Sequence, residues 1–426
     1  RARALIRAML FTDPVFLFYF LPAALLAVRL SAWTHRLRWW TKLVIVATTL
    51  AFYSYQNWRW PFIFLLVVGW TYGCAWAISL SRTGMARRTW LVNGIGGSLA
   101  LLALFKYLNW LARLWPALVP LQHSLAGPFG DGAIVVLPPG ISFYVFEAIS
   151  FTVDEYRRRV AFPKRPLDYL AFLAMFPRFI AGPIVRYADV AACFRAWPGM
   201  LIGRGLSLFA IGFILKVCFA DQFAVFVPYA FATARPDLLQ AWIGALAYTF
   251  QLYLDFWGYS LMATGLGLCL GFSFPDNFRS PYHSGSIGEF WRRWHITLST
   301  WLRDYLYIPL GGSRVGRIRV FINLVITMGL GGLWHGADVT FLVWGLYHGV
   351  LLSFEHAVGR DRINAVPHLA RVPLTFALVV LGWVLFRAHS FEQAGSVLAG
   401  LVGGHGLSGQ FNPLLLQKHW FSVGLV

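Results

Sequence analysis

The segment Pro61–Leu80 reads PFIFLLVVGWTYGCAWAISL and contains no charged side chain. A helix needs about 20 apolar residues to cross the hydrocarbon core of a bilayer, and this segment has that length. Over all 426 residues, 58% are hydrophobic and only 12% are charged, whereas soluble domains carry about 25% charged residues. The mean hydropathy is +0.61. The sequence therefore predicts an all-α, polytopic membrane protein, a transmembrane helical bundle of about 11–13 spans.

Apolar runs of similar character recur along nearly the whole chain. Besides Pro61–Leu80, the candidate spans are Val15–Val28, Leu43–Tyr55, Leu91–Leu111, Ile134–Val153, Leu167–Val185, Gly205–Ala220, Gln240–Phe256, Ser260–Phe274, Val320–Leu333, Thr340–Phe354 and Pro373–Phe386. A last run begins at Leu414 and stops at Val426, short of a full span, so we expect the C-terminal helices to be incomplete. We expect residues 1–426 to form a single integral-membrane domain.

The basic residues indicate how the early spans are oriented. The net charge of +19 would suggest nucleic acid binding on a soluble chain, but basic residues between apolar spans mark cytoplasmic loops. The loops Arg29–Lys42, Arg82–Arg88 and Arg157–Arg165 are basic, and the loops between them carry little charge. We therefore expect these three loops in the cytoplasm, the N-terminus outside and no nucleic acid partner. Arg1, Arg3 and Arg7 oppose this orientation, which suggests that translation begins at Met9.

The four cysteines, Cys74, Cys193, Cys218 and Cys269, are scattered and lack the spacing of a metal site. Most of them lie inside apolar runs, where a free cysteine packs like other small hydrophobic side chains. We expect neither a disulfide framework nor a bound metal.

A more polar block interrupts the apolar runs. Residues Gly285–Gly312 read GSIGEFWRRWHITLSTWLRDYLYIPLGG. Ser286 and Glu289 form an S-x-x-E capping box and Pro309 ends the pattern, so we expect one amphipathic helix over 286–308. A central arginine costs about 2.5–3.5 kcal/mol in a bilayer, so this helix should lie at the membrane interface or line a polar cavity. Helix chemistry alone fits a surface-lying helix with tryptophan anchors at least as well as a cavity wall.

A second block, Thr327–Gly349, reads TMGLGGLWHGADVTFLVWGLYHG and places His335 in a glycine-rich apolar run. Ionisable residues inside a membrane are rare and costly, so they indicate a functional role. Burial disfavours the imidazolium, which would keep His335 neutral and available as a general base. A histidine that only hydrogen-bonds between packed helices would fit the same pattern. His348, near the end of the block, is more typical of helix packing or of the membrane interface.

Asp255 is the acidic candidate, in the apolar run QLYLDFWGYS. Gln251 and Tyr259 lie four residues away on either side, on the same face of a helix. A hydrogen-bond hub that fixes helix packing explains this pattern better than a catalytic carboxylate does.

Several of these motifs together resemble the membrane-bound O-acyltransferase family, in particular its bacterial branch of alginate O-acetylases and related polysaccharide-acetylating proteins. The motifs are DFWGYS (Asp255–Ser260), Asp276-Asn277-Phe278, FWRRWHITLSTWLRDYLYIPLGG (Phe290–Gly312) and GGLWHGADVTFLVWGLYHG (Gly331–Gly349), with weaker similarity over nearly the whole chain. Leu261 departs from the alginate branch and is more similar to the branch that transfers D-alanine.

The resemblance implies a fold and a site. The fold would be a bundle of transmembrane helices around a membrane-crossing tunnel, with His335 and His295 near its narrow part. His335 would deprotonate the attacking hydroxyl and His295 would orient the donor or the acceptor. We expect the remaining site residues to bind substrate: Arg292, Arg293, Arg303, Trp334, Asp255 and Asn277. The arginines would lie at a cytoplasmic mouth that attracts an anionic donor.

The resemblance also implies a reaction in the bacterial inner membrane. An acyl group, acetyl in the first instance, would pass from a cytoplasmic thioester such as acetyl-CoA toward an extracytoplasmic polysaccharide such as alginate, without a bound cofactor. Transfer would be direct or through a periplasmic SGNH-type acetyltransferase partner. One alternative is acyl or D-alanyl transfer to a lipid or teichoic-acid carrier. Another is a transporter, which commonly has inverted repeats, but no repeat is found in this sequence.

Overall fold

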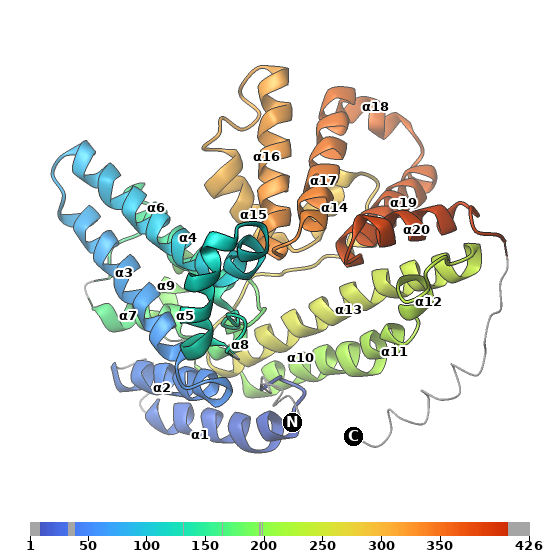
Figure 1. The fold of residues 1–426 in the computed structure, drawn as a ribbon. Coiled ribbons are helices and arrows are strands. Elements are labelled where there is room, and N and C mark those ends of the chain that lie inside the picture. Colours follow the sequence, from blue (N-terminus) through green and yellow to red (C-terminus); the bar gives the residue numbers. More distant parts are fainter. Residues whose placement is uncertain are drawn as a thin grey trace. The chain divides into compact units, whose positions relative to one another are not determined.

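The structure is a computed structural model that describes residues 9–32, 39–130, 132–163, 165–195, 197 and 199–407 (Figure 1). These residues are mainly helical, and the one β pairing among them is an isolated bridge between Gly130 and Val135. The predicted all-α class is therefore confirmed. Arg1, Arg3, Arg7, Lys164 and the run from Leu414 lie outside the described residues.

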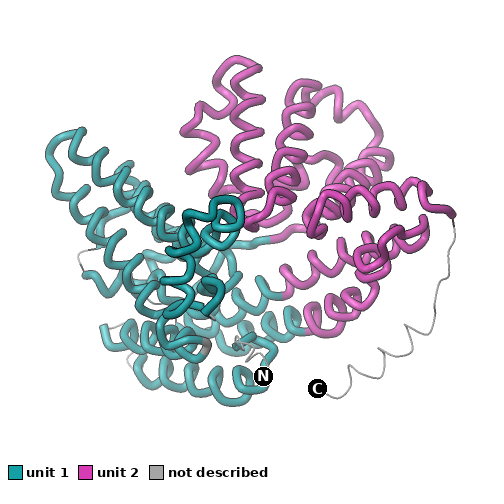
Figure 2. The backbone as a smooth tube through the Cα atoms, viewed as in Figure 1, with its two compact units in different colours: residues 1–213, 259–277 teal, residues 214–258, 278–426 magenta. Residues whose placement is uncertain are grey.

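The chain forms two compact units, which Figure 2 shows in different colours. Unit 1 consists of residues 1–213 and 259–277, and unit 2 consists of residues 214–258 and 278–426. The division falls inside α13 (Leu238–Cys269), which is one unbroken helix. The sequence had predicted two spans here, Gln240–Phe256 and Ser260–Phe274, and that prediction is wrong. The residues between the two predicted spans, Trp257–Tyr259, continue the helix.

Unit 1 holds the N-terminal helices. They are η1 (Phe16–Phe20), α1 (Leu21–Ser31), α2 (Trp39–Gln56), α3 (Trp60–Leu80), α4 (Gly84–Leu114), η2 (Pro116–Leu118), α5 (Val119–Phe129), α6 (Ile141–Tyr156), α7 (Pro166–Leu173), α8 (Phe176–Phe179), α9 (Tyr187–Arg195) and α10 (Ile202–Ile214). Helices α3, α4 and α6 pack against one another. Two helices of this unit, α3 and α4, are long and apolar enough to cross a membrane.

A buried ion pair organises the middle of unit 1. The carboxylate of Glu147 in α6 pairs with the guanidinium of Arg178 in α8, and both side chains are almost fully buried. Arg178 also donates to the carbonyl of Phe172, and Glu147 accepts from the backbone N–H of Val185 at 3.0 Å. Because these bonds fold the chain back on itself, the predicted span Leu167–Val185 is not a single helix. It is divided into α7, α8 and irregular backbone.

The helix ends that flank the three basic loops lie close together within unit 1. Lys42, at the start of α2, pairs with Asp168 in the first turn of α7 at 2.5 Å. Arg87, in the first turn of α4, donates to the carbonyl of Tyr156 at the end of α6 at 2.8 Å. The ends of the helices that flank the basic loops therefore meet, as loops on one side of a membrane would. The cytoplasmic assignment stays a prediction.

Unit 2 holds the two histidine blocks. Its elements, besides the first part of α13, are η3 (Leu215–Ala220), α11 (Asp221–Ala224), α12 (Pro228–Phe231), η4 (Pro281–His283), α14 (Ile287–Arg293), α15 (Ile296–Leu302), η5 (Arg303–Tyr307), α16 (Arg317–His335), α17 (Val339–Val358), α18 (Arg360–Ala365), α19 (His368–Arg387) and α20 (Phe391–Leu401). Of these, α16 and α19 are long and apolar enough to cross a membrane, and so is the helical run Ile202–Phe231 that enters the unit. The count of 11–13 spans stays a prediction.

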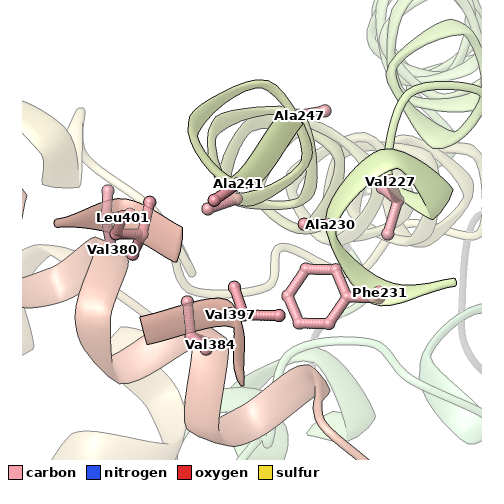
Figure 3. Close-up of a cluster of buried hydrophobic side chains, with 10 residues drawn as sticks. Val227, Ala230, Phe231, Ala241, Ala247, Val380, Val384, Val397 and Leu401 are labelled. Atoms are coloured by element: carbon pink, nitrogen blue, oxygen red, sulfur yellow. The ribbon is translucent and has the colours of Figure 1, made fainter. Parts of the chain in front are cut away.

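An apolar cluster anchors α19 within unit 2 (Figure 3). Phe231 of α12 lies between helices α13, α19 and α20, where Val384 and Val397 are almost fully buried. Burying side chains of this size contributes about 1.5–3 kcal/mol each. The cluster therefore holds the C-terminal end of α19, which carries Phe386, a residue of the candidate site.

Candidate active site

The arginine-rich block is two short helices rather than one. Ser286 caps α14 as predicted, since its hydroxyl accepts from the N–H of Glu289 at 3.1 Å. The Glu289 carboxylate in turn accepts a hydrogen bond from the N–H of Gly285 at 2.9 Å. The predicted continuous helix over 286–308 is nevertheless wrong. Helix α14 ends at Arg293, α15 begins at Ile296, and His295 between them has a left-handed backbone with φ 41°.

The break gives the adjacent residues Trp294 and His295 different aromatic neighbours. Trp294 packs on Trp383 of α19 at 4.8 Å and on Phe278 at 5.1 Å between ring centroids. His295 instead faces Phe256 of α13. A left-handed conformation costs a residue other than glycine about 1–2 kcal/mol, so the aromatic packing must outweigh that cost. Strained backbone of this kind concentrates at functional sites.

His295 is almost completely buried, with 1% of its surface exposed. Its imidazole lies 4.6 Å from the ring of Phe256 and 6.3 Å from that of Trp334, measured between centroids. The residue lies outside the helices that are long enough to span a membrane. Burial lowers the pKa of His295, and repulsion from a protonated His335 would lower it further, so this imidazole is neutral near pH 7.

His335 is the last residue of α16 and is partly buried. Aromatic rings surround its imidazole: Trp334 at 4.9 Å, Trp344 of α17 at 5.3 Å and Phe386 of α19 at 5.1 Å between centroids. Rings on three sides restrict the orientation of the imidazole, because edge-to-face contacts are favourable only over a narrow range of angles. Trp334 contacts both His295 and His335, so the two predicted catalytic residues lie in one site.

Close backbone contact fixes the helix that carries His335. A Cβ atom on Gly332 of α16 would collide with the carbonyl oxygen of Phe341, and one on Gly345 of α17 would collide with that of Met328. Small residues at such positions allow membrane helices to pack tightly. The turn between the helices is capped by Asp338, whose carboxylate accepts from the N–H of Thr340 at 3.1 Å. The end of α16 therefore has a defined position relative to α17.

Helix α17 also joins the two histidine blocks. The Glu355 carboxylate accepts from the backbone N–H groups of Ile287 and Gly288, the latter at 2.8 Å, and so caps the N-terminus of α14. His348 is fully buried and its Nδ1 accepts from the indole N–H of Trp291 at 3.3 Å. Of the two roles expected for His348, helix packing or the membrane interface, the structure shows helix packing. Sequence reasoning did not identify the capping role of Glu355.

The predicted substrate-binding arginines are exposed or half-buried, and two of them pair with neighbouring carboxylates. Arg293 pairs with Glu289 at 2.6 Å, and Arg303, which is 58% exposed, pairs with the adjacent Asp304 at 2.7 Å. Arg292 is exposed. Their role in binding a donor stays a prediction, whereas Trp334 contacts both histidines.

Asp255 has a partner that sequence reasoning missed. Lys216, in the π-helical segment η3, lies 2.8 Å from Asp255 and 2.5 Å from Asp221. A single lysine in the apolar run Gly205–Ala220 is costly without a counter-charge, and that signal could have indicated the pairing. Asp255 thus acts within a charge network, while its neighbour Phe256 contacts His295.

Asn277 belongs to unit 1, so its place relative to the histidines is not defined. Its amide donates to the hydroxyl of Ser260 at 3.1 Å, and both residues are buried. This bond ties the segment after α13 back to the helix. Asn277 therefore has a structural role. Its expected contact with substrate stays a prediction.

Fold and site together define a multi-pass, all-α membrane protein that holds two histidines around a shared tryptophan. Residues 77–388 match the family model described as MBOAT, membrane-bound O-acyltransferase family. The chain therefore belongs to the membrane-bound O-acyltransferase family and is an O-acyltransferase.

Individual relatives give the same assignment. The chain is 45% identical to the probable alginate O-acetylase AlgI of Pseudomonas syringae pv. tomato, over 91% of this chain and 74% of that protein. It is 34% identical to the peptidoglycan O-acetyltransferase of Helicobacter pylori, over 94% of this chain and 81% of that protein. Similarity to the teichoic acid D-alanyltransferase of Bacillus subtilis is lower, with 28% identity over 66% of this chain and 75% of that protein.

Proposed function

We propose that this chain transfers an acetyl group from a cytoplasmic acyl thioester, such as acetyl-CoA, toward an extracytoplasmic polysaccharide such as alginate. The proposed substrate class is supported by the 45% identity to a protein named as a probable alginate O-acetylase. The observation that carries the mechanism is the enclosure of His335 by aromatic rings beside the neutral, buried His295.

In the proposed reaction His335 accepts the proton of the attacking hydroxyl. The hydroxyl oxygen forms a bond to the thioester carbonyl carbon, the carbon–sulfur bond breaks, and the thiolate leaves and takes up the proton from His335. His295 orients the donor or the acceptor by hydrogen bonding, with Trp334 in contact with both imidazoles. Because a thioester is already activated, positioning and one base suffice for the transfer without a bound cofactor.

The acceptor in this proposal is a polysaccharide hydroxyl, reached directly or through a periplasmic SGNH-type acetyltransferase. The protein then acts in the bacterial inner membrane, and Arg292, Arg293 and Arg303 attract the anionic donor at its cytoplasmic side. Asp255 and Asn277 are the remaining proposed substrate-binding residues. Each also holds a helix in place.

Transfer of D-alanine to a teichoic acid is the second candidate. It is favoured by the similarity to the teichoic acid D-alanyltransferase of Bacillus subtilis and by Leu261 in the motif that follows Asp255. That relative is less similar and matches less of the chain than the probable alginate O-acetylase does. Acetyl transfer to a polysaccharide is therefore the better supported function.

The test is incorporation of labelled acetate into polysaccharide by cells that lack their own copy of the gene. The wild-type chain should restore incorporation, and His335→Ala should lower it by about 10²–10⁴-fold, the usual contribution of a general base. His123→Ala, which removes an exposed histidine of unit 1, is the matched control. Wild-type incorporation by His335→Ala at equal protein level would refute the mechanism. Incorporation of labelled D-alanine in place of acetate would select the second candidate.

A further inference from the structure

A basic cavity lies at the other end of the hairpin that carries His335. It has a volume of about 520 Å³, and its lining includes Arg317, Phe321, Ser353, His356, Asp361 and Arg362. These residues come from the start of α16, the end of α17 and α18. None of them belongs to the candidate active site.

The cavity has an excess of positive charge. Its lining contains two guanidinium groups, of Arg317 and Arg362, and one carboxylate, of Asp361. In the part of the chain that the structure describes, neither arginine has an ion-pair or hydrogen-bond partner. Arg319 and Arg360 lie close by in the sequence and add to the positive potential. Arginine binds phosphate through two parallel hydrogen bonds, so this chemistry suits a phosphate group.

The cavity is far from the proposed chemistry. Helix α16 runs from Arg317 to His335, and a helix of 19 residues is about 27 Å long. The helix is also one of those long and apolar enough to cross a membrane. A ligand in the cavity therefore lies at one end of a membrane-spanning helix and His335 lies at the other.

Exposed apolar side chains continue from the cavity along the same hairpin. Phe321 lines the cavity and is 46% exposed, while Phe354 and Val350 of α17 are 67% and 49% exposed. Val350 lies one turn before Ser353 and Phe354 one turn before Ala357, which both line the cavity. A charged cavity at a helix end with apolar surface below it matches the two parts of a phospholipid, its headgroup and its acyl chains.

We propose that this cavity binds the headgroup phosphate of an anionic phospholipid. The guanidinium groups of Arg317 and Arg362 hold the phosphate, and the acyl chains lie along Phe321, Val350 and Phe354. Basic pockets between membrane helices are a general form of lipid recognition. The bound lipid stabilises the α16–α17 hairpin from the end opposite His335, because a ligand stabilises the folded state to which it binds.

The test uses the full chain, purified and placed in bilayers of phosphatidylcholine to which phosphatidylglycerol is added. The thermal midpoint of the wild-type chain should rise by about 2–4 °C with phosphatidylglycerol. The double variant Arg317→Gln/Arg362→Gln should lose this rise. The charge-matched control Arg82→Gln/Arg113→Gln, which removes two exposed arginines of unit 1, should keep it. An unchanged rise in the Arg317→Gln/Arg362→Gln variant would overturn the proposal.

Two further experiments identify the source of the phosphate and provide a substitute if the glutamine variant does not fold. Inorganic phosphate at the same concentration should shift the wild-type midpoint less than the lipid does, and an equal shift would assign the cavity to soluble phosphate instead. If the glutamine variant cannot be purified, Arg317→Lys/Arg362→Lys replaces it. Lysine keeps the charge but loses the paired hydrogen bonds, so the rise should be smaller, and a full rise would contradict the geometry. No acyl donor is present, so the result is independent of the proposed transfer reaction.

Discussion

Glu147 and Arg178 in unit 1 and His295 and His335 in unit 2 are all ionisable groups set among apolar side chains, but they are held differently. Glu147 and Arg178 neutralise each other and bind two backbone groups, the carbonyl of Phe172 and the N–H of Val185. Aromatic rings hold the two imidazoles. A closed ion pair has no remaining capacity for chemistry, whereas an imidazole fixed by rings keeps its ability to accept a proton. The comparison separates a pair that maintains the fold from groups that we propose to act on a substrate.

Breaking the ion pair should have the largest effect on stability. Arg178→Ala leaves the Glu147 carboxylate buried without its partner, which typically costs about 3–5 kcal/mol. The expected result is a large drop in the thermal midpoint in detergent. The double variant Glu147→Leu/Arg178→Met removes both charges and should recover most of the stability. A wild-type midpoint for Arg178→Ala would mean that the pair does not support the fold.

His295 should show the opposite pattern, with lost activity and a retained fold. His295→Gly removes the imidazole but suits the positive φ, so acetyl transfer should fall by about 10²-fold while the thermal midpoint falls less than it does in His295→Ala. His295→Ala should lose the same activity and also about 1–2 kcal/mol of stability, because alanine disfavours the left-handed backbone. Equal activity of His295→Gly and wild type would show that the left-handed turn, rather than the imidazole, is required.

The glycine contact of the α16–α17 hairpin should have a smaller effect. Gly345→Ala forces a methyl group against the carbonyl of Met328, and such overpacking costs about 1–3 kcal/mol. Activity should fall with stability, since the hairpin positions His335. The matched control is Gly395→Ala in α20, where a Cβ atom meets no heavy atom within 4 Å. That control should stabilise by up to about 1 kcal/mol, the helix propensity gain. The same loss in both variants would contradict the close-packing argument.

The smallest effect is expected at the arginines of α14. Arg292 is exposed and Arg293 is partly neutralised by Glu289, so Arg292→Gln should weaken donor use more than Arg293→Gln. Exposed charge pairs contribute about 0.2–1 kcal/mol, which corresponds to a change of about 1.4- to 5-fold in the apparent KM for the donor. The dependence of that KM on salt should also decrease. Lower yield at unchanged KM would assign these arginines to anchoring the helix.

Features that depend on local sequence were predictable. The lengths of the apolar runs indicated the membrane class, and Ser286 with Glu289 indicated the start of α14, because capping involves residues only three apart. His335 and His295 were correctly expected to lie in one site, through a resemblance that extends over both blocks. Trp334 was expected as a substrate contact and is shared by both imidazoles.

Features that depend on contacts distant in sequence were not predictable in this way. The sequence around Trp294 and His295 contains no residue that disfavours a helix. The break between α14 and α15 arises from packing against aromatic rings of α13 and α19. The pairing of Lys216 with Asp255 joins residues on separate helices. The only signal for it in the sequence is the energetic cost of an unpaired lysine in an apolar run. Local propensity is a weak guide wherever tertiary packing opposes it.

The cap that Glu355 places on α14 has a consequence for how the protein is made. Helix α14 has seven residues and is too short to be stable by itself, and its cap is 68 residues further along the chain. At about 5–20 residues per second, the ribosome adds Glu355 about 3–14 s after Ile287. During that interval the newly made arginine-rich block has only its local cap, from Ser286 and Glu289, and lacks the Glu355 carboxylate. The active site is therefore completed late in synthesis, and a nascent chain released before Glu355 would carry both histidines without the carboxylate that caps α14.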